Sequence, residues 1–267
     1  MQPEVVVIGG GRMGAALVRG MLGAGRSPET LCVVEASPER RRQLADDLPG
    51  VTVRAEAVGG AGAVVAVKPV DAATACGALA TTATPRVLSI MAGVPLARLE
   101  QWLPPETAVV RAMPNTPATV GAGVAAVAGG SRAGDEDLAW ARGLLETTGL
   151  VVTLPETALD AVTGLSGSGP AYVFLLAEAL VEAGVGVGLA PEVSRLLAVG
   201  TVVGAGRLLE ATGAAPEELR AQVTSPGGTT EAGLRVLEGR GLRDTVAAAV
   251  AAATERSREL GGPPDPG

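Results

Sequence analysis

The N-terminal segment reads V-V-V-I-G-G-G-R-M-G, from Val5 to Gly14, and it decides the fold. Its β-branched start predicts a buried strand, and the apolar spacing from Met13 to Leu22 predicts a helix. Between the two stand Gly9, Gly11 and Gly14, in the spacing G-x-G-x-x-G. Glycines at such a turn let the backbone approach a pyrophosphate at the helix N-terminus, although they also serve as purely structural turn residues. With a strand before it and a helix after it, the segment predicts a dinucleotide-binding turn.

Short strands alternate with helices along the first 155 residues. Further strands are expected at Leu31–Glu35, Val51–Val53, Ala63–Val67, Val87–Ile90, Val109–Ala112, Gly123–Ala128 and Leu150–Leu154. Helices are expected between them at Pro38–Leu48, Asp71–Leu79, Pro95–Leu103 and Asp135–Thr148. This alternation predicts crossover connections and a mostly parallel, doubly wound α/β sheet. We therefore assign residues 1–155 to a Rossmann-like dinucleotide-binding domain.

The pattern changes after Pro155, where only helices are expected. They fall at Ala171–Val187, Glu192–Ala211, Pro216–Val223, Thr230–Leu237 and Leu242–Leu260. These helices are apolar on more than one face, which is more apolar surface than a helix with one solvated side can hide. We expect residues 156–260 to form a helical domain through which copies of the chain assemble into a homo-oligomer. The Gly/Pro-rich end, 261–267, is expected to be disordered.

The composition of the 267 residues excludes several classes of protein. There is no histidine, so histidine-based catalytic triads and histidine metal sites are excluded, and no metal site is expected. The net charge of −7, with only two Trp, one Tyr and one Phe, argues against nucleic-acid binding. Cys32 and Cys76 have no cluster of metal-ligand residues around them and are expected to be buried free thiols.

No stretch is expected to enter a membrane. The most apolar ones, Ala171–Leu189 and Leu196–Gly206, contain or border charged residues and fall short of roughly 20 uninterrupted apolar residues. The N-terminus shows neither the basic segment nor the cleavage site of a secretion signal. We therefore expect a cytoplasmic protein.

Residues after the second expected strand bear on the choice of dinucleotide. Glu35, about 20 residues beyond the glycines, suits a ribose 2′-hydroxyl and hence NADH. Ser37 and the run Arg40–Arg42 are residue types that bind a 2′-phosphate, which suits NADPH. Such arginines also form ordinary solvated helix faces. The residues themselves leave both cofactors open.

Two further candidates follow strands at the carboxyl edge of the expected sheet, where open α/β folds bind ligands. Lys68 directly follows the expected strand Ala63–Val67 and is a candidate to bind the phosphate or ribose of the cofactor. An exposed loop lysine is the competing interpretation. Asn115 stands between two prolines in M-P-N-T-P, and its amide is a candidate for the nicotinamide or its ribose. A rigid turn is the competing interpretation of that segment.

The helical domain contains the segment T-S-P-G-G-T-T, from Thr224 to Thr230. It precedes an expected helix, and the free N–H groups of a helix start bind anions such as a carboxylate. Its Ser and Thr side chains are also ordinary helix caps. Carboxylate binding and capping are compatible at one helix terminus, and both stay open for this segment.

In its motifs the chain resembles the pyrroline-5-carboxylate reductase family over nearly its whole length. The blocks are I-G-G-G-R-M-G at Ile8–Gly14, A-V-K-P at Ala66–Pro69, R-A-M-P-N-T-P at Arg111–Pro117, L-S-G-S-G-P-A-Y at Leu165–Tyr172 and T-S-P-G-G-T-T-E-A at Thr224–Ala232. The chain departs from the family at Arg12, where asparagine is frequent, and at Glu35, where members that prefer NADPH tend to be neutral or basic. The resemblance implies reduction of 1-pyrroline-5-carboxylate to L-proline, commonly with NADPH, by dimers that often assemble in fives.

The resemblance also implies roles for individual residues. Substrate binding falls to Ser225, Pro226, Gly227, Gly228, Thr229 and Thr230, with the Thr230 hydroxyl reaching the ring nitrogen as the catalytic contact. Cofactor binding falls to Ile8, Gly9, Gly11, Arg12, Met13, Gly14, Glu35, Ser37, Ala66, Val67, Lys68, Pro69 and Asn115. A cyclic imine that arrives protonated accepts hydride without a strong protein acid, which agrees with the absence of histidine.

Other functions compete with this one. A 3-hydroxy-acid dehydrogenase of the same plan would place a catalytic lysine at the start of the helical domain, and no lysine is there. A reductase of another cyclic imine, or a non-catalytic regulatory protein that binds a dinucleotide, stays open on the fold alone. The intact T-S-P-G-G-T-T segment argues against the regulatory protein, because a sensor has no use for a carboxylate site.

Overall fold

The computed structural model describes residues 2–262. The chain forms two compact units. The first holds the residues up to Ser168 together with those from Ala251 onward, and the second holds Gly169–Val250.

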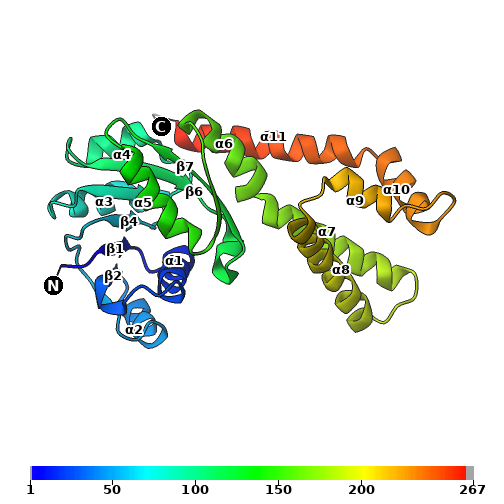
Figure 1. Ribbon diagram of the computed structural model, residues 1–267, viewed down its shortest axis with the longest axis horizontal. Helices are drawn as coiled ribbons and strands as arrows, with labels where there is room; N and C mark the ends of the chain where they lie inside the picture. The colour runs from blue at the N-terminus through cyan, green and yellow to red at the C-terminus, as the bar shows by residue number, and fades with distance from the viewer. Residues whose placement is uncertain (1, 263–267) are drawn as a thin grey trace. The chain divides into compact units, whose positions relative to one another are not determined.

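An eight-stranded sheet forms the first unit, in the order β3-β2-β1-β4-β5-β6-β7-β8 (Figure 1). Neighbouring strands are parallel, except that β6 and β7 are antiparallel. The mostly parallel sheet is therefore confirmed. The order reverses between β1 and β4, which is where doubly wound sheets bind their ligands. The strands are β1 Val5–Ile8, β2 Leu31–Val34, β3 Thr52–Arg54, β4 Ala63–Val65, β5 Arg86–Ser89, β6 Ala108–Met113, β7 Gly123–Gly129 and β8 Gly149–Thr153.

The residues of β1 show that helices cover both faces of the sheet. All four are buried, and they alternate between two apolar cores, Val5 and Val7 in one and Val6 and Ile8 in the other. A strand covered on both sides is apolar without interruption, which is why its sequence shows no alternation. Leu, Met and Ala side chains of the flanking helices complete the two cores. These helices are α1 Arg12–Gly23, α2 Pro38–Asp47 and α5 Asp135–Glu146 on one face, and α3 Ala72–Ala80, α4 Leu96–Trp102 and α6 Leu159–Val162 on the other.

The second unit contains only helices, as expected. Pro191 and Pro216 stand at the first positions of α8 and α9, where proline loses no helical hydrogen bond. Gly213 ends α8 with a φ of 60°, in the left-handed region that favours glycine. The helices are α7 Gly169–Gly186, α8 Pro191–Thr212, α9 Pro216–Gln222, α10 Thr229–Gly239 and α11 Leu242–Gly261, of which α11 runs on into the first unit.

The paired helices α7 and α8 leave large apolar side chains exposed. The Ser194 hydroxyl donates to the Val181 carbonyl at 2.7 Å and ties the two helices together. Phe174, Leu175 and Leu196 are nevertheless 60%, 65% and 74% exposed, and no residue of α7 is buried. Apolar surface of this extent marks an interface with another chain.

One helical run differs from expectation in its length. Because α6 and α7 are joined by a helical turn, the run Glu156–Gly186 is continuous, and its most apolar window has a mean hydropathy of 1.3. By length and composition alone this run is able to cross a membrane, and the bent pair Pro191–Thr212 and Pro216–Gln222 passes only when taken together. The run is nevertheless interrupted by Glu178 and Glu182, as the sequence indicates. A single such helix is weak evidence for a membrane protein, because helices buried in protein pass the same test.

The compact units do not coincide with the expected boundary at residues 155 and 156. Helix α6 packs on β6 and β7, and the end of α11 returns to it, where the Ser257 hydroxyl donates to the Asp160 carboxylate at 2.7 Å. These contacts join residues 156–168 to the sheet. The tail expected to be disordered, 261–267, lies outside the described residues except for Gly261, which ends α11, and Gly262.

A buried ion pair fixes the chain where it leaves the sheet. Arg111, on β6, is 6% exposed, and its Nη1 lies 2.9 Å from Oε1 of Glu156. The same oxygen accepts a hydrogen bond of 2.7 Å from the Leu96 N–H at the start of α4. Arg111 Nε is buried and has no partner among the residues that the structure describes. The buried guanidinium therefore depends on one carboxylate for its charge compensation.

The substitution Glu156→Ala tests this dependence. Because it leaves a buried cation without its partner, we expect the free energy of unfolding to fall by about 3 kcal/mol. The control is Glu4→Ala, which removes an exposed carboxylate from its pair with Arg26 and should cost less than about 1 kcal/mol. Urea unfolding at one fixed protein concentration measures both. Equal losses in the two variants would contradict the role of the buried pair.

Candidate functional site

The turn from β1 into α1 is closed by two glycines. Gly9 has a φ of 103°, and a Cβ at this position would lie 2.7 Å from the carbonyl oxygen of Ala66. A Cβ on Gly14 would collide with the carbonyl oxygen of Gly9. Strand β1, helix α1 and the end of β4 thus approach one another more closely than side chains would allow. Both residues therefore have to be glycine.

The third glycine leaves space for a ligand instead of for packing. Nothing lies within 4 Å of the Cβ position of Gly11, which is exposed and provides no side-chain cap for α1. The N–H groups of Arg12, Met13 and Gly14 have no hydrogen-bond partner within the described residues. Unpaired N–H groups and the positive end of the helix dipole bind phosphate. The turn therefore fits the pyrophosphate of a dinucleotide.

Glu35 holds the rim of this turn. Its Oε2 accepts from the Gly10 N–H at 3.0 Å, and its Oε1 accepts from the Ser37 N–H at 2.9 Å. The carboxylate thus links the glycine turn to the loop between β2 and α2. It lies just beyond the end of β2, where a ribose 2′-hydroxyl is recognised in sheets of this kind.

The arginines near Glu35 are less available for a phosphate than their types suggest. Arg40 Nε donates to the Gly10 carbonyl at 2.9 Å, and Arg41 Nη1 donates to the carbonyls of Glu35 and Ala36, each at 2.7 Å. The interpretation of these two residues as a solvated helix face is therefore wrong, because both are tied to the loop. The Ser37 hydroxyl caps α2 by accepting from the Arg40 N–H at 3.3 Å.

The segment Ala66–Pro69 lies beside the glycine turn. Strand β4 ends at Val65 rather than at Val67, and the Ala66 N–H donates to the Ile8 carbonyl at 2.7 Å. Lys68 is exposed and directly precedes a short 3₁₀ helix, Pro69–Asp71. Ile8, Ala66 and Val67 thus form the wall of the turn, and the ammonium group of Lys68 is free to meet a ligand at the carboxyl edge of the sheet.

Asn115 is held between two segments of the first unit. The residue is 8% exposed, its Nδ2 donates to the Ser166 carbonyl at 2.9 Å, and its Oδ1 accepts from the Val124 N–H at 2.9 Å. Both polar atoms already have partners inside the first unit. Asn115 thus connects two protein segments, and binding of the nicotinamide or its ribose by this amide stays a prediction.

The segment Thr224–Thr230 forms a tight loop that leads into α10. The Gly228 N–H donates to the Ser225 carbonyl at 3.0 Å, and Gly227 has a φ of 71°. The Gly227 N–H donates to the Glu231 carboxylate at 2.7 Å. The N–H groups of the two glycines are thus used within the loop, and the glycines give it its shape.

Three N–H groups at the start of α10 remain available. Those of Thr229, Thr230 and Glu231 have no partner among the described residues, because the first donors of a helix lack acceptors in the preceding turn. The hydroxyl-bearing residues Ser225 and Thr230 are both exposed. The loop therefore combines open donors with hydroxyl groups, an arrangement that suits a small carboxylate.

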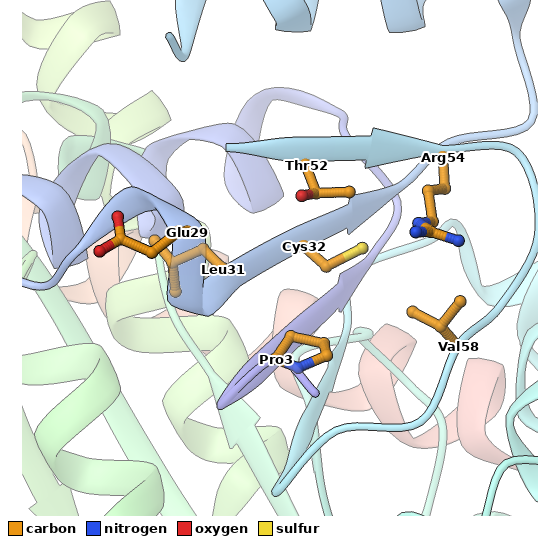
Figure 2. Close-up of a pocket in the computed structure, with 7 residues that line it drawn as sticks. All are labelled: Pro3, Glu29, Leu31, Cys32, Thr52, Arg54 and Val58. Atoms are coloured by element: carbon orange, nitrogen blue, oxygen red, sulfur yellow. The ribbon is translucent and has the colours of Figure 1, made fainter. Parts of the chain in front are cut away.

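A cavity of about 180 Å³ lies on the face of β2 and β3 and is a separate feature (Figure 2). Its lining residues Leu31 and Thr52 stand at the amino ends of these strands, and Arg54 stands at the carboxyl end of β3. Burial raises the pKa of the Cys32 thiol at its wall, despite the opposing charge of Arg54. Burial also raises the pKa of Cys76 to about 11. Both cysteines are buried and unpaired, as expected, and stay protonated at neutral pH.

The comparisons with known proteins agree with this division of the sites. Residues 156–260 match a family described as pyrroline-5-carboxylate reductase dimerisation, and residues 4–93 match one described as NADP oxidoreductase, coenzyme F420-dependent. A pyrroline-5-carboxylate reductase of Mycobacterium tuberculosis is 45% identical in an alignment that covers 96% of each chain. This chain belongs to the pyrroline-5-carboxylate reductase family. As a member it is an NAD(P)H-dependent oxidoreductase, and its dimerisation domain makes it a homo-oligomer.

Other members of the pyrroline-5-carboxylate reductase family extend the likeness. The enzyme of Synechocystis is 42% identical over 98% of this chain and 99% of its own. The structure of the Coxiella burnetii enzyme matches with a TM-score of 0.92 at 35% identity, over 98% of this chain and 100% of that one. A Plasmodium falciparum pyrroline carboxylate reductase, solved with NADP bound, matches with a TM-score of 0.83 at 28% identity, over 97% and 98% of the two chains.

Sequence reasoning missed two residues at these sites. Glu231, on α10, closes the loop Thr224–Thr230 by accepting from the Gly227 N–H, and no motif identifies this contact. Ser166 is held by Asn115 through its carbonyl. A signal for that contact does exist in the sequence, because Pro170, four residues later, cannot donate the usual helical hydrogen bond.

The substitution Glu35→Ser tests the cofactor preference in this family member. A carboxylate at the end of β2 repels a 2′-phosphate, so its removal should raise the ratio of kcat/KM with NADPH to kcat/KM with NADH by about tenfold. The control is Glu29→Ser, which removes an equal charge just before the other end of β2 and should leave the ratio unchanged. Steady-state kinetics with both cofactors measure the ratio. An unchanged ratio in Glu35→Ser would place the ribose elsewhere.

Proposed function

We propose that this chain reduces 1-pyrroline-5-carboxylate to L-proline with NAD(P)H, the last step of proline biosynthesis. The observation that carries the proposal is the pairing of two open helix starts in one chain. One is the glycine turn before α1, and the other is the loop Thr224–Thr230 before α10. The identity with named reductases over nearly the whole chain supports the same reaction.

The carboxylate of the substrate is bound at the start of α10. It accepts from the free N–H groups of Thr229 and Thr230 and from the Ser225 hydroxyl. Pro226, Gly227 and Gly228 give the loop the shape that presents these donors. The Thr230 hydroxyl reaches the ring nitrogen and orients the imine.

The main task of the protein in this reaction is to orient the imine relative to the nicotinamide. The reduced nicotinamide, when bound, supplies the hydride that the imine carbon accepts. The chain contains no histidine, and the imine is basic enough to arrive protonated, so that Thr230 has to orient the nitrogen rather than protonate it. The glycine turn and the T-S-P-G-G-T-T loop thus position two ligands, and neither provides an acid.

We further propose the cofactor, the assembly and the compartment. NADPH is the working cofactor and NADH an alternative, as the NADP-bound Plasmodium falciparum relative suggests. The helical domain forms homodimers through the exposed faces of α7 and α8, and five dimers assemble into a decamer. The enzyme works in the cytoplasm, without nucleic acid or membrane as a partner. A monomer in analytical ultracentrifugation at micromolar concentration would contradict this assembly.

Turnover of the purified chain tests the reaction. We expect 1-pyrroline-5-carboxylate to drive oxidation of NADPH, followed by the loss of nicotinamide absorbance, with L-proline as the product. The substitution Thr230→Ala should lower kcat/KM by about tenfold or more through lost orientation, whereas Thr229→Ala should change it much less.

Two outcomes would contradict the proposal at different levels. No turnover by a folded chain that binds NADPH would indicate another imine or a regulatory protein. Normal kcat/KM in Thr230→Ala would leave the reaction in place and remove Thr230 from the role of orienting the nitrogen.

A further inference from the structure

The carbonyl of Ser166 lacks its ordinary helical partner. In an α-helix it would accept from the N–H of the residue four positions later, and that residue is Pro170, which has none. Asn115 supplies the missing donor, with its Nδ2 at 2.9 Å from the Ser166 oxygen. A side chain at the end of the sheet thus replaces a backbone donor that a proline has removed.

The chain around this carbonyl is a π turn, Thr163–Gly167. The Ser168 N–H reaches back five residues to the Thr163 carbonyl at 2.8 Å. Gly167 lies against the end of β6, since a Cβ on it would stand 2.6 Å from Cε of Met113. Single π turns inside helices are uncommon and are frequent at functional sites. This one is held at one end by Asn115 and at the other by its own backbone.

The π turn lies at the edge of the sheet that binds the cofactor. The ends of β4, β5 and β6 share one edge, because these strands are parallel. Glu35 marks the ribose side of the glycine turn, beyond β2. A dinucleotide that crosses the turn from this side continues over β4 to β6. In that arrangement its nicotinamide end would lie toward Met113, Asn115 and the π turn.

We propose that Asn115 is a positioning residue for hydride transfer. By giving the Ser166 carbonyl the donor that Pro170 withholds, it fixes the π turn Thr163–Gly167 beside the nicotinamide ring. The proposal takes its substrate from the proposed function, whereas its geometry rests on the hydrogen bonds of Asn115. Each polar atom of Asn115 already has a protein partner, which is why we assign it a positioning role and not a direct contact.

A double-mutant cycle on Asn115 and Pro170 tests the proposal. The substitution Asn115→Ala removes the donor, and Asn115→Asp removes it while keeping an acceptor for the Val124 N–H. We expect each to lower kcat about tenfold and to leave the dissociation constant of NADPH within about threefold of its original value. The substitution Pro170→Ala restores a backbone donor to the Ser166 carbonyl. In that background the loss of kcat on Asn115→Ala should shrink to about threefold or less.

A second readout does not need the imine. The fluorescence of bound NADPH reports the surroundings of its ring, and we expect Asn115→Ala to change it and the double variant to restore it. If Asn115→Ala alone does not fold, the double variant is compared with Pro170→Ala, where the proposal predicts a folded chain with nearly the same kcat and fluorescence.

The contrary outcomes are distinct from one another. An equal loss of kcat and an equal change of fluorescence in both backgrounds would overturn the role of Asn115. A weakened NADPH affinity with unchanged kcat would make Asn115 a direct cofactor contact instead. Absence of turnover by the unmodified chain would speak against the proposed function, and the fluorescence cycle would still decide the role of Asn115.

Discussion

The close approach of β1, α1 and the end of β4 is the constraint on which the rest of the structure depends. Gly9 faces the Ala66 carbonyl and Gly14 faces the Gly9 carbonyl, at separations that no side chain tolerates. This approach sets the point at which the strand order reverses, and it directs the start of α1 toward the carboxyl edge of the sheet. Glu35 then ties the same turn to the loop after β2. Cofactor binding thus follows from the way the sheet closes around its first strand.

The substrate site that we propose lies in the second unit and has the same physical basis as the glycine turn. The start of α10, like the start of α1, exposes N–H groups that the loop before it leaves unpaired. In each case glycines shape the approach and an acidic side chain, Glu35 or Glu231, holds one loop N–H. Two anionic groups can therefore be bound with few cationic side chains and without histidine. The absence of a histidine acid suits a substrate imine that is already protonated, because orientation is then the main task of the protein.

The sequence predicts the fold well because hydrophobic runs and glycine turns are local signals. Val5–Ile8 and the glycines after it determine a strand, a turn and a helix from neighbouring residues alone. Asn115 shows where such reasoning stops, because its role depends on a contact with Ser166, 51 residues later. The compact units also depend on distant contacts, since the bond between Ser257 and Asp160 joins segments 97 residues apart. Nothing local in the sequence indicates that Arg40 bonds the Gly10 carbonyl or that Arg41 bonds the carbonyl of Glu35.

The most direct test of this account is the affinity for NADPH of the variant Gly11→Ala. Gly11 has a φ of −65°, which alanine adopts freely, and nothing lies within 4 Å of its Cβ position, so the substitution should leave the fold and the thermal unfolding midpoint unchanged. The added methyl would occupy the space at the start of α1 where the pyrophosphate binds. We expect the dissociation constant of NADPH to rise by about tenfold or more, whereas Gly23→Ala, at the other end of the same helix, should have no such effect. An unchanged dissociation constant in folded Gly11→Ala would contradict the assignment of the cofactor to the glycine turn.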